Sequence, residues 1–186
     1  ESLQNINGLK VRIGGGIAQS SAKALGLVPL QAPVTKAYEL LSGGVADGIQ
    51  LPSESISFFK LDRIIKQGFI FDGGLYNVSM FLVINKNKWT KLAPEDQKAI
   101  SSVSGEALAK LAGKAWDNAD QRGIDTSLKN GVKLKILSKD DKILAKKLLT
   151  PIIEKTLNKI SKQKNINAKR IYLELLNEIK IIKNKH

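Results

Sequence analysis

The feature that most constrains the fold is a regular alternation of short apolar and short helical stretches near the start of the chain. Strands are expected at 9–13 and 27–31, helices at 17–25 and 36–41, and residues 45–49 lead into a third strand-like piece that ends at Pro52. The connections are short, and a helix between two strands brings the strands side by side in the same direction. The alternation therefore predicts an α/β fold with a largely parallel sheet.

The rest of the chain is predicted to be mostly helical. Residues 80–84 are continuously apolar, which is typical of a strand buried on both faces. Phe58 and Phe59 have core spacing, and Trp116 is expected to pack under a long helix. The expected elements are a helix at 53–65, strands at 69–71 and 76–84, a long helix from 94 to about 129, a strand at 132–136, and helices at 138–161 and 167–183.

The chain lacks most of the side chains that usually perform catalysis or bind metals. The chain has no cysteine, and its only histidine is the last residue, His186. A cysteine or histidine nucleophile, a general base of the histidine type and a thiolate metal site therefore lack their usual side chains. We predict that the chain is not an enzyme and has neither a cofactor nor a metal site.

No targeting or membrane segment is recognisable in the sequence. No apolar run approaches the roughly 20 residues that span a bilayer. The first residues, 1–5, have neither a basic region nor an apolar one, so we expect no signal peptide within this chain.

The positive charge is concentrated in the last third of the chain. The net charge is +13, and residues 129–186 hold 16 lysines and arginines against five acidic residues. Arg170 is the only arginine there and Tyr172 the only aromatic residue, whereas nucleic-acid surfaces favour arginine and stacking aromatics. We predict a solvated lysine face and no nucleic-acid partner. The alternative is a basic module that binds nucleic acid or an anionic surface through residues 129–186.

Arg12 is the residue best placed for binding a ligand. It lies at the end of the first expected strand, directly before Gly14–Gly15–Gly16 and the start of a helix. Open α/β sheets bind ligands at the carboxyl ends of their strands, where an arginine can hold a carboxylate with two parallel hydrogen bonds. The spacing alone leaves two interpretations open: an anion site, or a solvated arginine followed by a tight turn.

Three segments resemble, in order and spacing, signatures of the solute-binding subunits of TRAP (tripartite ATP-independent periplasmic) transporters of the DctP type. They are GLKVRIGGGIA at 8–18, PVTKAYELL followed by GVADG at 33–48, and LVINKNKW followed by LAPEDQK at 82–98. The resemblance implies a lobe of the periplasmic-binding-protein type (class II) with long C-terminal helices. It also implies an extracytoplasmic, periplasmic receptor that captures a small organic acid and passes it to membrane permease subunits.

The resemblance also implies which residues form the site. Arg12 takes the position that binds the ligand carboxylate, and Gly16, Val34 and Leu51 take positions that line the cleft. Relatives that bind sugar acids tend to have an aromatic residue at the position of Val34 and an amide at that of Leu51. Both are aliphatic here, which favours a smaller or more apolar acid.

Four further polar residues are candidates for ligand contacts. Gln50, Ser53 and Glu54 flank Pro52, and Asn77 could face the cleft. Ser53 and Glu54 have an equally good alternative interpretation, because serine and glutamate are favoured at the start of a helix.

The resemblance finally predicts how the chain divides. Residues 1–77 and 118–186 are expected to build the second ligand-binding lobe with its C-terminal helices. Residues 78–117 are expected to cross into a first lobe that is mostly absent from this chain. The apolar stretch at 80–84 would then lack sheet neighbours and be exposed.

Overall fold

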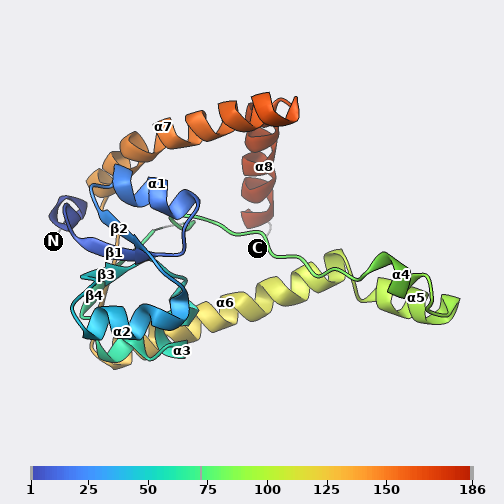
Figure 1. Cartoon of the computed structure of the whole chain (residues 1–186), viewed down its shortest axis with the longest axis horizontal. Helices are drawn as coiled ribbons and strands as arrows, with labels where there is room; N and C mark the ends of the chain where they lie inside the picture. Colours follow the sequence, from blue (N-terminus) through green and yellow to red (C-terminus); the bar gives the residue numbers. More distant parts are fainter. Residues whose placement is uncertain (1, 72, 185–186) are drawn as a thin grey trace.

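The fold contains two small parallel sheets, which are surrounded by helices of very different lengths (Figure 1). The structure is a computed structural model that describes residues 2–71 and 73–184. His186, the only histidine, lies outside the described residues.

The first sheet confirms the predicted alternation at the start of the chain. Its three strands lie parallel in the order β2-β1-β3, so that β1 is central. Arg12 in β1 lies opposite Leu30 on one side and Ile49 on the other. The elements are η1 (Leu3–Ile6), β1 (Lys10–Ile13), α1 (Ile17–Ala24), β2 (Val28–Gln31), η2 (Val34–Lys36), α2 (Ala37–Ser42) and β3 (Gly48–Ile49).

The second sheet joins two distant parts of the chain. Strand β4 (Gln67–Ile70) pairs in parallel with β5 (Lys133–Ile136), and Gly68 lies opposite Leu134. Before β4 the chain forms α3 (Ser53–Phe58) and the short turn η3 (Leu61–Arg63). The helix expected at 53–65 is therefore shorter than predicted, because Lys60 adopts a left-handed conformation at φ 56° and ends it.

The hydrophobic core lies between the first sheet and the helices above it. Val11 and the fully buried Ile13 of β1 pack with Ala18 and Ala22 of α1. Helix α7 (Lys139–Lys164) lies across α1 and adds Ala145 to this core, and α8 (Ala168–Lys183) turns back from its end (Figure 1). The helices predicted at 138–161 and 167–183 are thereby confirmed.

Helix α6 (Glu106–Lys129) is anchored to the lobe by its C-terminal half. It packs against α3, and its buried Gly123 touches the backbone of Ser53 so closely that a β-carbon would not fit. The backbone N–H of Glu54 also donates to Oδ1 of Asp120, at 2.9 Å. The other half of α6 extends away from the lobe (Figure 1).

The strand expected at 76–84 is not formed. The described residues after Tyr76 run as an extended, unpaired segment to α4 (Lys86–Trp89) and α5 (Pro94–Ser102), which lie at the far end of α6 (Figure 1). Phe81 is 84% exposed and Leu82 82% exposed. Among the described residues no neighbouring strand accepts the backbone hydrogen bonds of this segment, so its apolar sequence alone does not make it a strand.

The single long helix predicted from 94 to 129 is two helices. The chain turns at 103–105, where Gly105 has φ 58° and ψ −125°, and α6 begins at the next residue. Two core predictions are also wrong: Phe58 is 75% exposed and Trp116 is 44% exposed. Periodicity places both on an apolar face, but the described part of the chain has no element that covers that face.

No helix in the described ranges is both long enough and apolar enough to span a membrane.

Candidate functional site

An open cavity of about 460 Å³ lies at the carboxyl end of β1. The β1–α1 turn, the start of η2, the segment after β3 and the segment after β4 all contribute to it. The described residues that line it are Arg12, Gly14, Gly15, Gly16, Ile17, Ala18, Val34, Leu51, Pro52, Ser55, Tyr76 and Val78.

Arg12 is held in place by the chain itself. Its side chain is buried, with 6% of the residue exposed, and both Nε and Nη2 donate to the carbonyl oxygen of Ala32, at 2.9 and 2.7 Å. Ala32 directly follows β2, the strand that pairs with β1, so the strand pairing sets the position of this carbonyl. The edge of the guanidinium formed by Nε and Nη2 is therefore occupied.

The opposite edge of the guanidinium remains for a ligand. A guanidinium carries five N–H groups, and Ala32 accepts from two of them. No other acceptor is found for Arg12 among the described residues, so Nη1 and the second Nη2 hydrogen are left to bind a carboxylate end-on. Burial lowers the pKa of Arg12 from its usual value, and the nearby Tyr76 partly opposes this effect. The group stays positively charged because arginine starts from so high a pKa.

The start of α1 supplies a second source of positive potential. Gly16 precedes the helix with φ 61° and ψ −131°, and no side chain caps the helix. Among the described residues, the backbone N–H groups of Gly16, Ile17 and Ala18 have no acceptor. All three residues line the cavity. Free amides at a helix start favour an anion, and they border the same space as Arg12.

The remaining walls are mostly apolar. Ile17, Val34, Leu51 and Val78 contribute aliphatic side chains. Arg12 is the only charged side chain among the described lining residues. The cavity thus combines one fixed cation with an apolar surround, which suits a carboxylate attached to an apolar body.

Two other polar side chains reach the cavity. The hydroxyl of Ser55 donates to Oε1 of Glu54 and is therefore already paired. Tyr76 is half-buried, and burial raises the pKa of its phenol while the positive charge of Arg12 partly lowers it. No hydrogen-bond partner of the Tyr76 hydroxyl is found in the part of the chain that the structure describes.

The structure brings four of the predicted site residues together. Arg12, Gly16, Val34 and Leu51 all line the cavity. Gln50 lies next to them without lining it: its backbone N–H donates to the carbonyl oxygen of Arg12 at 3.0 Å. Both side-chain polar atoms of Gln50 are buried, and neither has a partner among the described residues.

The other three candidates lie outside the lining. Ser53 begins α3, and its carbonyl group packs against Gly123. Glu54 lies in the first turn of α3, which supports its helix-start interpretation, and its Oε1 accepts from the Ser55 hydroxyl. Asn77 is exposed, and its amide donates to the carbonyl oxygen of Gly73 at 3.4 Å. A role of these three in ligand binding stays a prediction.

Several cavity residues were not among the predicted site residues, including Ser55 of α3, Tyr76 and Val78. Tyr76 and Val78 follow β4, and the expected strand at 76–84 placed them in a sheet instead of at the site. The paired glycines Gly73 and Gly74, which both have positive φ, were the available signal. They turn the chain after β4, as glycines between two apolar segments commonly do.

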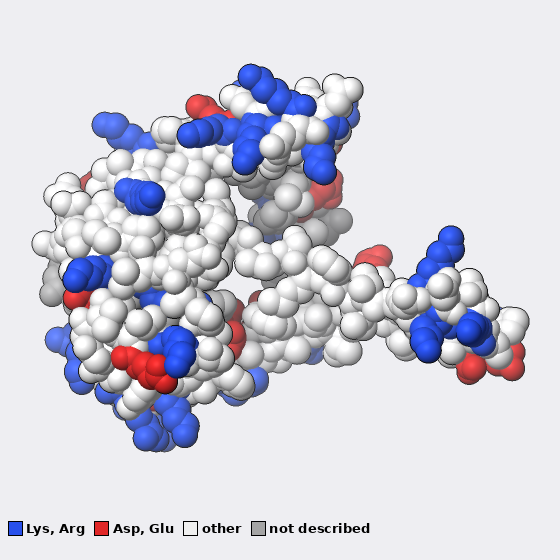
Figure 2. Space-filling view, viewed as in Figure 1, with Lys and Arg blue, Asp and Glu red and all other residues white. Residues whose placement is uncertain are grey.

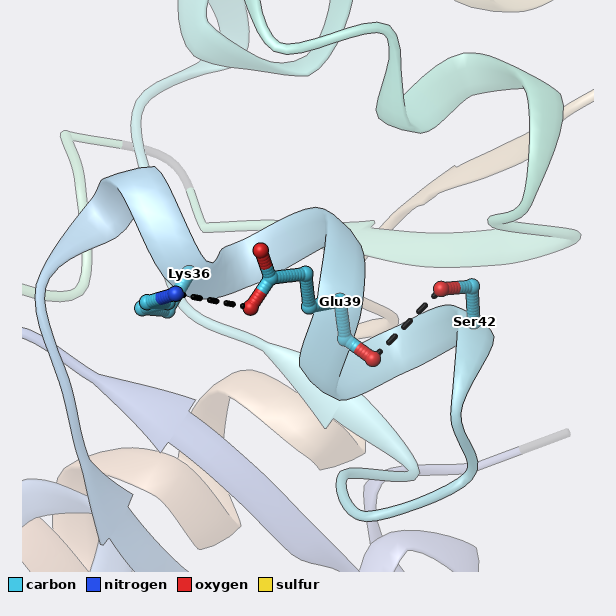
Figure 3. A network of polar contacts seen from close by, with 3 residues as sticks. All are labelled: Lys36, Glu39 and Ser42. Carbon is cyan, nitrogen blue, oxygen red and sulfur yellow. Dashed lines mark hydrogen bonds and ion pairs between the residues drawn. The ribbon is translucent and has the colours of Figure 1, made fainter.

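The polar network on α2 is a surface feature (Figure 3). Lys36 and Glu39 form an ion pair of 2.9 Å, and the Ser42 hydroxyl donates to the carbonyl oxygen of Glu39 at 3.4 Å. The Lys36 and Glu39 side chains are 59% and 67% exposed, and such pairs contribute little to stability. The network supports the short helix that follows Val34 but adds no ligand group.

The positive side chains do not gather in one pocket. Figure 2 shows lysines and arginines spread over α7 and over the distant α4–α5 segment, with acidic side chains between them. In the described ranges, Arg170 pairs with Glu174 at 3.5 Å. This distribution is that of a solvated charged surface.

The sequence matches a known family over most of its length. The model of the family described as bacterial extracellular solute-binding protein, family 7, matches residues 1–160. The protein named outer membrane transporter protein TsaT, from Comamonas testosteroni, is 26% identical over 162 residues, which are 87% of this chain and 48% of TsaT. The chain spans about half the length of the curated relatives it matches.

Solved structures share the fold. A TRAP periplasmic solute-binding protein from Bordetella bronchiseptica, with bound (R)- and (S)-mandelate, is 33% identical with a TM-score of 0.84; the match covers 98% of this chain and 57% of that one. A marine-metagenome TRAP solute-binding protein specific for aromatic acid ligands, solved with 3-hydroxybenzoate, is 30% identical with a TM-score of 0.77 and covers 91% and 53%. The predicted resemblance and fold are confirmed: the chain belongs to family 7 of the bacterial extracellular solute-binding proteins, the DctP family.

Proposed function

We propose that this chain forms the carboxylate-binding lobe of a periplasmic receptor, which captures a small organic acid and delivers it to the membrane permease subunits of a TRAP transporter. The observation that carries the proposal is the buried Arg12, whose Nε–Nη2 edge is fixed by Ala32 and whose other edge is free at a cavity. The function is binding without chemical conversion of the ligand.

The cavity favours a monocarboxylate with an apolar body. Arg12 is its only cation among the described lining residues, so a second carboxylate would lack a charged partner there. The aliphatic Val34, Leu51 and Val78 would leave the hydroxyls of a sugar acid unpaired. The bound mandelate of the Bordetella protein and the 3-hydroxybenzoate of the marine protein support an aromatic acid.

We also propose that residues 78–117 belong to a first lobe whose remaining part lies outside this chain. The exposed apolar segment around Phe81 and the uncovered face of α6 around Trp116 support this division. Residues 1–77 and 118–186 would form the second lobe. Closure of the first lobe over the cavity would bury the side of the ligand that the open cavity leaves to solvent.

The test is the variant Arg12→Lys in the full-length gene product. Affinity would be measured by calorimetry for mandelate, benzoate, 3-hydroxybenzoate and succinate. Lysine cannot form both the bonds to Ala32 and two parallel hydrogen bonds to the carboxylate. We therefore expect the affinity for every acid that the wild type binds to fall by at least about 10-fold. Arg63→Lys, at an exposed arginine in η3, is the control and should leave affinity unchanged.

Two outcomes would overturn the proposal. One is an Arg12→Lys variant that binds each acid as tightly as the wild type does. The other is a wild-type protein that binds none of the four.

The second candidate function is a basic interaction module. The 16 lysines and arginines of residues 129–186 favour it, because such charge attracts nucleic acid or an anionic surface. Phosphate binding through six contacts would weaken by about 1,000-fold between 50 and 200 mM salt. Titration of duplex DNA at both salt concentrations distinguishes the candidates, and on the receptor proposal no binding is expected at the higher one.

A further inference from the structure

We infer that Tyr76 is a specificity-determining residue that pairs with a hydroxyl group of the ligand, so that the acid bound at Arg12 is a hydroxy acid. The inference rests on the proposed function and narrows its substrate class. It adds a second polar side chain for ligand recognition to a cavity whose other described side chains are mostly apolar.

The hydroxyl of Tyr76 is the polar side-chain group of the described lining that remains unassigned. Among the described lining residues other than Arg12, only Ser55 and Tyr76 have polar side chains. Ser55 donates to Glu54. Tyr76 has no hydrogen-bond partner among the described residues although its ring is half-buried. Phenol groups in such positions normally find a partner, and a ligand hydroxyl would provide one.

Tyr76 and Arg12 approach the cavity from different elements. Arg12 comes from the central strand β1, whereas Tyr76 follows β4 of the second sheet. Both side chains line the same cavity, and the positive charge of Arg12 partly lowers the pKa of the Tyr76 phenol. A ligand with its carboxylate on the free edge of Arg12 would then have a hydroxyl near that carboxylate within reach of the phenol.

The chemistry of the phenol fits a hydroxyl partner. A neutral phenol both donates and accepts, and so does an alcohol, so that either orientation of the pair gives a hydrogen bond. Burial raises the pKa of Tyr76, which keeps the phenol neutral at physiological pH. A site that pairs with a ligand hydroxyl binds the analogue without it more weakly, because the half-buried phenol then lacks this partner.

The experiment compares two acids that differ by one hydroxyl. Mandelate and phenylacetate share the ring and the carboxylate, and only mandelate has the α-hydroxyl. Dissociation constants for both acids would be measured with the full-length wild type and with Tyr76→Phe, which keeps the ring and removes the phenol oxygen. The control is Tyr38→Phe, at a tyrosine in α2 that is 47% exposed and outside the cavity lining.

We expect the wild type to bind mandelate more tightly than phenylacetate by about 3- to 10-fold. Tyr76→Phe should remove this preference by weakening mandelate alone, whereas Tyr38→Phe should keep it. A merely structural role of Tyr76 would instead weaken both acids equally. Equal weakening, a wild type without the preference, or a preference that survives in Tyr76→Phe would each overturn the inference.

These outcomes are separate from failure of the proposed function. If Arg12→Lys abolishes binding of both acids while Tyr76→Phe changes neither, the receptor function stands and the hydroxyl assignment falls. If Arg12→Lys changes nothing, or if the wild type binds neither acid, the proposed function falls and this inference falls with it.

Discussion

The backbone N–H of Leu3 donates to Oδ1 of Asp141 at 2.8 Å, across 138 positions of the sequence. The other carboxylate oxygen, Oδ2, accepts from the Ser138 hydroxyl at 2.8 Å, and that hydroxyl in turn accepts from the backbone N–H of Asp141 at 3.1 Å. One carboxylate therefore joins the start of the chain to the start of α7. Since α7 also packs on α1, this joint supports the lobe that contains the cavity.

Asp141→Asn is expected to destabilise the protein. The amide is neutral and presents a donor where the carboxylate accepts, so that the bond from Leu3 or the bond from Ser138 is lost. Asp140→Asn is the control, because this neighbour is exposed. Urea unfolding at pH 7 should give a lower free energy of unfolding for Asp141→Asn than for Asp140→Asn. Equal values would contradict a structural role of the Leu3 bond.

The same carboxylate should make stability depend on pH in the acid range. The hydrogen bond from the Leu3 backbone, followed by that from Ser138, lowers the pKa of Asp141 in the folded state. A lowered folded pKa stabilises the protein above the unfolded value of about 3.9, and this contribution is lost as the pH falls through the folded pKa. The stability difference between wild type and Asp141→Asn should therefore be constant near neutrality and shrink below about pH 4. A difference that grows in acid would have the wrong sign.

Gly123→Ala should weaken the packing of α6 against α3 and destabilise the protein. A β-carbon there would lie 2.7 Å from the carbonyl carbon of Ser53 and 2.8 Å from Cα of Glu54, which is too close for real atoms. Overpacking of this kind costs about 1–3 kcal/mol, measured as the free energy of unfolding. Gly113→Ala on the same helix meets nothing within 4 Å and should stabilise by up to about 1 kcal/mol, since alanine favours helices. Similar effects at both positions would contradict the packing of α3 on α6.

Gly16→Ala should damage the site more than Gly14→Ala does. Both glycines line the cavity, and an added β-carbon meets nothing within 4 Å at either. Only Gly16 has a positive φ, 61° with ψ −131°, where a side chain costs about 1–3 kcal/mol. We expect Gly16→Ala to lower thermal stability and to weaken binding of mandelate through displacement of the α1 amides. Unchanged affinity in Gly16→Ala would contradict a role of those amides.

Replacing the exposed apolar side chains at 81–83 by serine should reduce self-association of this chain when it is produced alone. Phe81, Leu82 and Val83 are 84%, 82% and 75% exposed, and apolar segments of this kind associate with one another. Light scattering after size-exclusion chromatography would show the change as a shift toward monomer. Matched serine substitutions at the smaller Ala109 and Ala112 of α6 should have little effect.

Local sequence patterns were sufficient to predict an element wherever the element packs against another that is nearby in the sequence. The order β1-α1-β2-α2-β3 followed from apolar spacing and short connections, and Arg12 was placed at a strand end from the same pattern. The fold of this part depends on neighbours within about fifty residues, so a single sequence contains most of the information.

Prediction failed where partners are distant or missing. Residues 80–84 have the composition of a buried strand, but a strand needs a neighbour, and none lies beside them among the described residues. Phe58 was expected in the core because it lies on an apolar face, but no described element covers that face and the residue is exposed. Tyr76 was missed because its place at the cavity depends on how the second sheet, formed by β4 and the distant β5, sits beside the first.

The bonds from Arg12 to Ala32 have a kinetic consequence. A guanidinium that is already fixed before the ligand arrives needs no rotamer search on encounter, so that little side-chain entropy is lost when the complex forms. The association rate constants of different acids should then be similar, because each acid meets the same preorganised guanidinium. Differences in affinity between acids would arise mainly in how long each one stays bound.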